Sequence, residues 1–400
     1  MSLVIILFTY VGIAIGRVPS LRMNRTSIAL VGAAALIAIQ AITQQQALAS
    51  IDIGTILLLF AFMVLNVNLR LAGFFNLVGY HVLRLARTPR VLLALVVLAS
   101  GVLSALFLND TICLLFTPFV VDLTKRLKRN PIPYLIGLAT AANIGSTATI
   151  TGNPQNLIIG QASGISYVHF LAALGPIALL GLAVAWLIVV LMFRDEFRTP
   201  LAQIDLPEPT YYRPLLWRCV AVVIGLLVAF LGGLPITSSA FVAAALLLIT
   251  RLRPQKMLAL EWDLLAFFIG LFIVTGAIEV TGVSKSLYHA VAPLLQSGVP
   301  ALSGLTLVLS NLVSNVPAVL LFRPEIPNFP NPTQAWLTLA MASTLAGNFT
   351  LLGSVANLIV AEIAAARDVK LTFWAYLRVG VPVTLLTTLI GVIYLSLFVK

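Results

Sequence analysis

Two short motifs, one in each half of the 400-residue chain, carry polar side chains that could bind an ion. The first reads Leu108-Asn109-Asp110-Thr111 and the second reads Ser314-Asn315-Val316-Pro317, and in both a proline stands nine residues after the asparagine. Amide and carboxylate oxygens are ligands for hard cations. The motifs therefore predict an ion or substrate site at Asn109, Asp110, Thr111, Ser314 and Asn315, with Na⁺ at Asn109, Asp110 and Asn315.

Asp110 is the single most informative side chain, because it stands between two long apolar runs. A carboxylate at membrane depth is a functional-site hypothesis by default, either as a sodium ligand or as a proton carrier. The alternative is structural, since an aspartate placed just before the helix expected over 112–124 is a good N-cap. The two roles can coexist. Five other acids lie near predicted span ends, where water is available, and are weaker candidates: Asp52, Glu261, Asp263, Glu279 and Glu362.

A second pair of motifs interrupts two apolar runs, at about 132–161 and 333–364. Thr-x-x-Gly-x-x-x-Asn-Leu-Ile begins at Thr149 and again at Thr350, a constant shift of 201 residues. Unwound backbone there would leave carbonyls for a cation and a half-helix N-terminus for an anion; the alternative is close helix packing through small residues. The candidate binding residues are Asn143, Ser146, Thr147, Thr149, Thr151, Gly152, Asn153, Asn156, Asn348, Thr350, Gly353, Ser354 and Asn357.

The composition determines what kind of elements must position these residues. The chain is 60% hydrophobic and 9% charged, with 24 Lys and Arg against 13 Asp and Glu. Soluble domains carry about 25% charged residues, so the chain is expected to be a polytopic membrane protein built from helices. Basic residues gather in cytoplasmic loops of such proteins, which accounts for the net charge of +11 without a nucleic-acid partner. No basic residue is expected at membrane depth.

The charge pattern also predicts the topology. Basic clusters precede the run at 91–108 and follow the run at 112–124, so both ends of this pair are expected on the cytoplasmic side. A re-entrant helical hairpin over about 91–124 explains this better than the alternative of two ordinary spans with an external turn. A second hairpin is expected over about 300–323. Re-entrant backbone is permitted where protein or a water-filled cavity surrounds it.

Together these patterns predict an all-α membrane protein made of two inverted-topology repeats of five spans each. Each repeat contains a re-entrant hairpin and an interrupted helix, as in alternating-access transporters. Residues 1–200 form the first repeat, 201–213 a cytoplasmic connector and 214–400 the second repeat. Five crossings per repeat place both chain termini on the outer side of the membrane.

These segments resemble the ion transporter superfamily, and specifically its ArsB/NhaD-type permeases and the anion permeases among them. The likeness covers nearly the whole chain and rests on Ala105–Pro118, Ala142–Asn156 and Ser310–Pro317. It implies scaffold and transport domains, a homodimer and elevator-like alternating access. The distantly similar sodium-coupled dicarboxylate symporters carry Ser-Asn-Thr at both hairpin tips; only the asparagine is kept here, which disfavours dicarboxylate transport.

The leading functional hypothesis is a secondary active permease for a small inorganic anion or metalloid oxyacid, coupled to H⁺ or Na⁺. The alternative is a Na⁺/H⁺ antiporter that uses Asp110. A passive channel is disfavoured by the paired hairpins, and an enzyme by the lack of a nucleophile–histidine pair at depth. No cofactor is expected. The protein is expected to lie in the bacterial inner membrane, with the lipid bilayer, a second subunit and a small ion or oxyacid as its partners.

Overall fold

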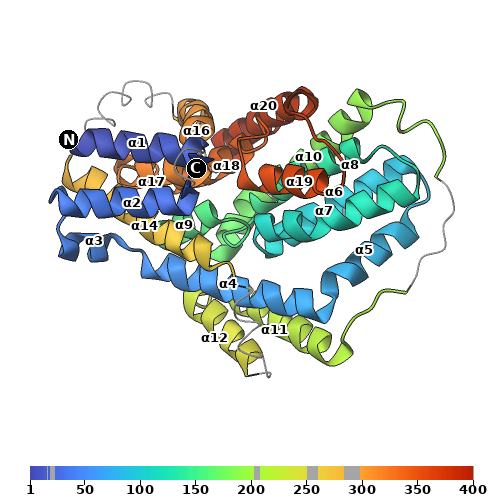
Figure 1. Ribbon diagram of the computed structural model, residues 1–400, viewed down its shortest axis with the longest axis horizontal. Coiled ribbons are helices and arrows are strands. Elements are labelled where there is room, and N and C mark those ends of the chain that lie inside the picture. The colour runs from blue at the N-terminus through green and yellow to red at the C-terminus, as the bar shows by residue number, and fades with distance from the viewer. Residues whose placement is uncertain (16, 19–22, 202–207, 250–259, 283–297, 400) are drawn as a thin grey trace.

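The computed structural model describes all residues except 16, 19–22, 202–207, 250–259, 283–297 and 400. Over this part of the chain the structure is helical, apart from a two-residue antiparallel pair, β1 (Arg17–Val18) and β2 (Met23–Asn24), which the all-α prediction lacks. The first half contains α1 (Ser2–Ile15), α2 (Arg25–Ala38), α3 (Gln44–Ser50), α4 (Ile53–Ala72), α5 (Phe74–Leu85), α6 (Pro89–Leu106), α7 (Asn109–Arg126), α8 (Pro131–Ser146), α9 (Pro154–Ser163) and α10 (Tyr167–Met192) (Figure 1).

The second half of the chain is also helical. It contains α11 (Arg213–Leu231), α12 (Ile236–Leu248), α14 (Trp262–Val280), α16 (Val299–Val313), α17 (Asn315–Phe322), the 3₁₀ turn η2 (Ile326–Asn328), α18 (Pro332–Ala346), α19 (Val355–Ala365) and α20 (Phe373–Phe398). The predicted connector over 201–213 lies partly outside the described residues, which lack 202–207.

Asparagine and proline mark where the key helices begin. Asn130 and Asn331 accept a hydrogen bond from the first turns of α8 and α18, and both helices start with a proline. A capping side chain satisfies one of the free N–H groups of the first turn, and proline is tolerated there because its missing N–H would have no helical partner. The same Asn-Pro signal, at Asn153 and Pro154, starts α9.

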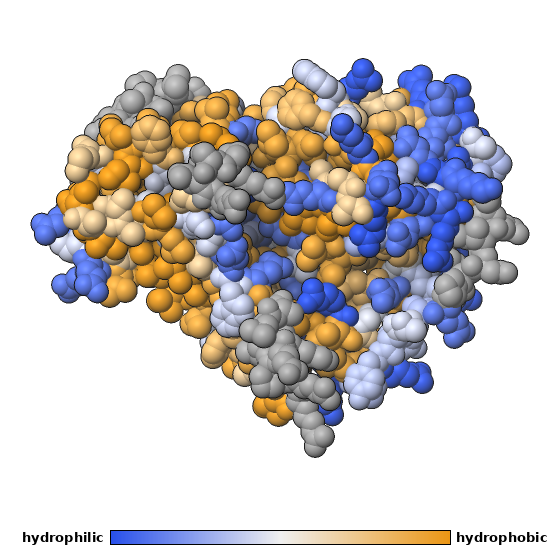
Figure 2. All heavy atoms as spheres, in the orientation of Figure 1, coloured by the Kyte–Doolittle hydropathy of each residue, from blue (hydrophilic) through white to orange (hydrophobic). Residues whose placement is uncertain are grey.

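Among the described residues, six helices are long and apolar enough to cross a membrane: α4, α6, α10, α11, α14 and α20. Their outward faces carry large apolar side chains that lie exposed in the isolated chain, such as Leu179 of α10, Val228 of α11 and Leu389 of α20. Figure 2 shows apolar residues covering much of the visible surface. Exposed apolar surface on this scale marks a lipid-facing protein. The protein is therefore a polytopic membrane protein.

In the same part of the chain there are five shorter apolar helices, of 10 to 17 residues: α1, α2, α12, α16 and α19. At 1.5 Å per residue, a helix of such length spans less than the roughly 30 Å of a hydrocarbon core. By length alone they do not cross a membrane, so the predicted count of five crossings per repeat remains a prediction.

The helices pack in two groups. We call α1, α2, α4, α11, α12 and α14 the frame group, because α2 packs on α14, α4 packs on α12, and α1 and α11 lie beside them. We call α6 to α10 and α16 to α20 the core group, in which α6 packs on α8, α16 on α18 and α10 on α20. The two groups meet where α4 contacts α9 and where α14 contacts α17. The candidate residues of the sequence motifs all belong to the core group.

Ion pairs tie the helix ends together. Asp122 near the end of α7 pairs with Arg367 after α19 at 3.6 Å, and the Arg129 guanidinium pairs with Glu196 after α10 at 3.7 Å. The indole N–H of Trp186, near the end of α10, donates to the backbone carbonyl of Arg90 at 3.1 Å. The start of α6 and the ends of α7, α10 and α19 therefore lie at one end of the core group.

Candidate functional site

The segment between α8 and α9 contains no helix, and side chains close its backbone. The Asn156 side-chain amide donates to the carbonyls of Ser146 at 3.0 Å and of Thr149 at 2.9 Å. Asn153 caps α9 by accepting from the Asn156 backbone N–H at 2.8 Å. These bonds occupy carbonyls that the end of α8 leaves without helical partners. The interruption is thus a fixed turn within buried polar surroundings.

The segment between α18 and α19 is built in the same way. The Asn357 amide donates to the carbonyls of Gly347 at 2.7 Å and of Thr350 at 3.1 Å, and Ser354 caps α19. The amide donor and its two acceptors stand 201 residues after their counterparts in the first half, whereas Ser354 accepts from the Ala356 N–H rather than from that of Asn357. The equivalence predicted from the two Thr-x-x-Gly motifs therefore extends to hydrogen bonds that the sequence could not show.

Asn143, near the end of α8, connects the α8–α9 segment with the α18–α19 segment through hydrogen bonds of its side-chain amide. Its nitrogen donates to the Asn348 side-chain oxygen at 2.9 Å and to that of Asn357 at 3.1 Å. Its oxygen accepts from the Asn109 amide at 3.0 Å and from the Ser354 hydroxyl at 3.1 Å. An asparagine side chain can make two donor and two acceptor bonds, so Asn143 is saturated. It connects the start of α7 with the interruption of the other half.

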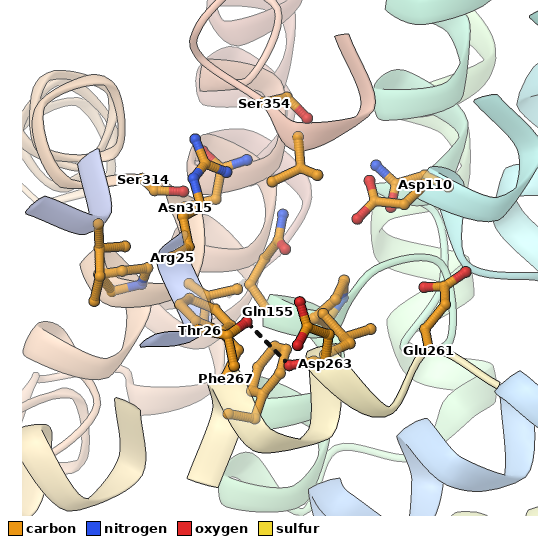
Figure 3. A pocket seen from close by; sticks show the side chains of 18 residues that line it. Arg25, Thr26, Asp110, Gln155, Glu261, Asp263, Phe267, Ser314, Asn315 and Ser354 are labelled. Carbon is orange, nitrogen blue, oxygen red and sulfur yellow. Dashed lines mark hydrogen bonds between the residues drawn. The ribbon is translucent and has the colours of Figure 1, made fainter. Parts of the chain in front are cut away.

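A cavity of about 310 Å³ (Figure 3) adjoins this network, because Asn109 and Ser354, which bond to Asn143, line it. The first residues of α7 and α17 reach it as Asn109, Asp110 and Asn315, and the starts of α9 and α19 reach it as Gln155 and Ser354. Four helices thus begin at this cavity: α7 and α17, which start at the short motifs, and the half-helices α9 and α19. The opposite wall comes from the frame group: Ile13, Arg25, Thr26, Glu261, Asp263, Leu264, Phe267 and Phe268.

Asp110 lies in the first turn of α7, where its carboxylate faces the cavity. The predicted capping role is wrong, because α7 begins at Asn109 and its N-cap is Leu108, which makes no side-chain bond. The helix begins earlier because the Asn109 backbone N–H is satisfied by the Gly152 carbonyl at 3.0 Å. The Asp110 carboxylate makes no hydrogen bond or ion pair with any residue that the structure describes. It is therefore available to a ligand.

Several predicted site residues lie away from the cavity. Thr111 accepts from Asn66 of α4 at 3.1 Å and lines a small separate cavity with Glu261. Thr147 donates to the Asn143 carbonyl within its own turn. The hydroxyls of Thr149 and Thr151 face the Ala105 carbonyl of α6. Thr350, Gly152 and Gly353 contribute backbone to the turns, while Ser146, Asn153, Asn156, Asn348 and Asn357 form the buried network beneath the cavity.

Other cavity residues were missed from the sequence or ranked low. Arg25 is the main correction, because the sequence predicts no basic residue at the site and Arg25 faces the cavity from α2. In the sequence, Arg25 follows the first apolar run together with Arg17 and Arg22, a pattern that is typical of a cytoplasmic loop. Glu261 and Asp263, expected near water at a span end, line the same space. No periodicity could identify these residues, since only the packing of α2 and α14 against the core group brings them there.

Free hydrogen-bond acceptors dominate the cavity and its floor. Asn109 and Asn315 are buried, with only 4% and 8% of their surface exposed, and the side-chain oxygen of each has no hydrogen-bond partner. The Asp110 and Glu261 carboxylates add further acceptors, whereas the Asp263 carboxylate accepts from Asn24. Arg25 is the one cation among the lining residues. Buried polar groups are normally paired, so these oxygens are suited to a ligand that donates hydrogen bonds or carries positive charge.

Broken helices whose ends converge on a polar cavity, within a polytopic helical protein, define a secondary transporter. Comparison with known proteins identifies the family: residues 10–346 match the model described as CitMHS, citrate transporter. The chain belongs to the CitMHS family of the ion transporter superfamily, as the motif resemblance predicted, and is therefore a transporter and not an enzyme.

The relatives span nearly the whole chain. The chain is 34% identical to the silicon efflux transporter LSI3 of Oryza sativa, over 94% of this chain and 93% of the relative. It is 31% identical to the inner membrane protein YbiR of Escherichia coli, over 87% and 88%, and 24% identical to a transporter named arsB in Dictyostelium discoideum, over 93% and 87%.

Proposed function

We propose that this protein is a secondary active transporter that exchanges an uncharged metalloid oxyacid for protons, with Asp110 as the shared binding group. The observation that carries the proposal is the cavity at Asn109, Asp110 and Asn315, where the unpaired amide oxygens of Asn109 and Asn315 converge with the unpaired Asp110 carboxylate. Of the two substrate classes expected from the sequence, an inorganic anion or a metalloid oxyacid, this chemistry favours the oxyacid.

An uncharged oxyacid presents O–H groups, which an acceptor-rich wall can bind. Silicic, arsenous and boric acids are of this kind at neutral pH. Ionised Asp110 would accept from such a ligand, whereas protonated Asp110 would not accept at the protonated oxygen. Proton and oxyacid would then compete for one carboxylate, which is the condition for exchange. The printed name of the rice relative, a silicon efflux transporter, supports this substrate class.

An anion fits the cavity less well. Citrate, named in the family description, would meet three carboxylates and one guanidinium. Two unit charges about 6 Å apart repel by roughly 3 kcal/mol at an effective dielectric constant near 20. An inorganic anion faces the same three carboxylates, and the starts of α7, α9, α17 and α19 at the cavity offset only part of that repulsion.

Transport by two inverted repeats is part of the proposal. The turn bonds of Asn156 and Asn357 support the repeat, because donor and acceptors shift together by 201 residues. The 26-residue helices α10 and α20 support it further, since each has an internal proline at its tenth position, Pro176 and Pro382.

The re-entrant hairpins α6–α7 and α16–α17 follow from the same reasoning. Trp186 and Glu196, at the end of α10, contact the start of α6 through Arg90 and the residues after α7 through Arg129. This supports a helix pair that enters and leaves on one side of the membrane. The Asp52–Arg323 ion pair, at 3.2 Å, joins the start of α4 to the end of α17, where the second hairpin would return to the other side. We place both chain termini on that outer side.

We further propose that the core group moves against the frame group as an elevator, with a homodimer formed through the frame. The cavity supports this division, because Asp110 and Asn315 come from the core group whereas Arg25, Glu261 and Asp263 come from the frame group. Movement of one group past the other would carry the bound oxyacid away from the frame wall.

A Na⁺/H⁺ antiporter is the second candidate. The excess of three carboxylates over one guanidinium around the cavity favours it, because such a wall also attracts a cation.

Transport in proteoliposomes distinguishes the two candidates. We expect arsenous or germanic acid loaded inside the vesicles to exchange for the labelled acid outside, whereas sulfate and citrate give no exchange. Liposomes without protein measure simple diffusion of the acid. Exchange of sulfate or citrate alone would refute the oxyacid proposal, and Na⁺-driven proton movement without any oxyacid would replace it with the antiporter.

A further inference from the structure

Arg25 is held at the cavity by the way α2 begins. Asn24 caps α2 by accepting from the Ser27 N–H at 2.9 Å, and its amide donates to the Asp263 carboxylate at 3.0 Å. The Thr26 hydroxyl donates to the Asp263 carbonyl at 3.2 Å (Figure 3). The residues on both sides of Arg25 are thus tied to α14 of the frame group. Its position is therefore fixed relative to the frame.

The Arg25 guanidinium is not committed to a partner. It makes no ion pair within 4 Å and no side-chain hydrogen bond with any residue that the structure describes. Asp110 is equally unpaired, and Figure 3 shows the two side chains on opposite sides of the cavity. Guanidinium groups in low-dielectric surroundings are normally paired with anions. An unpaired cation facing an unpaired carboxylate across one cavity therefore requires an explanation.

Arg25 also lies between two cavities. Besides the central cavity, it lines a second cavity of about 420 Å³ together with residues of α19, among them Leu358 and Glu362. Thr26, Asp263 and Val355 are likewise shared between the two cavities. A ligand that leaves the central cavity through the second cavity passes Arg25.

We propose that Arg25 is a coupling residue: its fixed positive charge attracts ionised Asp110 when the carrier is empty and so prevents the empty core group from moving across the membrane. This inference rests on the proposed proton exchange at Asp110. Protonation of Asp110 removes the attraction, and a bound oxyacid separates the two charges. Only the two loaded forms then move freely, which is the requirement for obligatory exchange. Without Arg25, the empty carrier would return and protons would leak.

The charged groups around Asp110 determine the expected pH behaviour. Arg25 faces it from α2, Glu261 and Asp263 from the start of α14, and Cys113 lies one turn on along α7. Arg70 of α4 lies near Glu261, and Glu362 of α19 lies beyond Arg25. Removing Arg25 deletes the cation that faces Asp110 directly, so Asp110 should hold its proton to higher pH.

The test measures proton leak in proteoliposomes under a pH gradient without any oxyacid. We expect Arg25→Gln to leak about five- to tenfold faster than the wild type, and the leak to disappear in the double variant that also carries Asp110→Asn. Arg25→Lys should stay near the wild-type rate. The matched control is Arg198→Gln, which removes an exposed cation far from the cavity and should not leak. The pH of half-maximal exchange should rise in Arg25→Gln, because the cation that favours ionised Asp110 is gone.

In the Arg25→His variant, pH switches the positive charge at position 25 on and off, so the presence and absence of the charge are compared in one protein. Its leak should be low near pH 5.5 and rise as pH passes through about 6.5, the ordinary pKa of histidine. A leak in Arg25→Gln equal to that of the wild type, or a leak in Arg25→His that does not change with pH, would overturn the inference. Either result leaves the proposed function standing if the wild type still exchanges oxyacid for protons; loss of that exchange in the wild type would refute the proposed function itself.

Discussion

Replacing Asn143 by alanine should destabilise the protein more than replacing a buried asparagine whose side chain bonds only within its own helix. The change removes four hydrogen bonds at once, to Asn109, Ser354, Asn348 and Asn357. Hydrogen bonds between membrane helices contribute about 0.6 kcal/mol on average, with a maximum near 1.7 kcal/mol. Four of them amount to about 2.4 kcal/mol at the mean value.

Burial raises this figure. Asn143 is 1% exposed, so its former partners lose their bonds in surroundings that offer few replacements. An unsatisfied buried group costs about 1–3 kcal/mol, although water from the nearby cavity can reach some of the four. We expect a total loss of about 3–5 kcal/mol.

The matched control is Asn68→Ala. Asn68 of α4 is equally buried, but its amide donates only to the Val64 carbonyl one turn back in the same helix, at 2.8 Å. That carbonyl keeps its helical bond, so the loss should be about 1 kcal/mol. The two variants are compared by heating them in detergent and measuring how much protein remains monodisperse at each temperature. An equal effect of Asn143→Ala and Asn68→Ala would refute the view that Asn143 joins the two halves.

Three further predictions follow from the same contacts. Asp110→Asn should abolish pH-driven accumulation of the oxyacid while the protein still purifies as a monodisperse sample; normal accumulation in this variant would remove Asp110 from the mechanism. Gly152→Ala should greatly reduce transport and stability, because an added Cβ would lie 2.3 Å from the Ser146 carbonyl oxygen, whereas at Gly353 the nearest contact is 3.0 Å, to the Asn311 side chain; equal effects in transport and unfolding assays would show that the first turn is not rigid. Arg129→Ala should destabilise by roughly 3 kcal/mol, because it leaves Glu196 without its buried partner; Arg198→Ala, which removes an exposed pair, should have no measurable effect in the same unfolding assay.

The sequence predicted the parts of the site that depend on local chemistry. Helix-poor residues within apolar runs indicated the interruptions near Gly152 and Gly353, and the spacing of Asn109 and Asn315 before their prolines indicated two equivalent motifs. These signals work because glycine, proline and asparagine act on the backbone within a few residues of themselves. Of the residues predicted to bind a ligand, Asn109, Asp110, Ser314, Asn315 and Ser354 line the cavity, and their role in binding remains a prediction.

The opposite wall of the cavity could not be predicted in this way. Arg25 follows an apolar run and stands among other arginines, a pattern that is typical of a cytoplasmic loop. Its place at the cavity depends on the packing of α2 against α14, to which Asn24 and Thr26 bind. The start of α7 was misjudged for a related reason: a long-range bond from Asn109 to the Gly152 carbonyl allows the helix to begin one residue before Asp110.

The most direct test of the central claim is the proton movement that accompanies oxyacid transport in proteoliposomes. We predict that adding arsenous or germanic acid outside the vesicles drives protons in the opposite direction in the wild type, with no requirement for Na⁺. The same addition should move no protons in Asp110→Asn. Oxyacid transport without proton movement, or proton movement that persists in Asp110→Asn, would contradict exchange at this carboxylate.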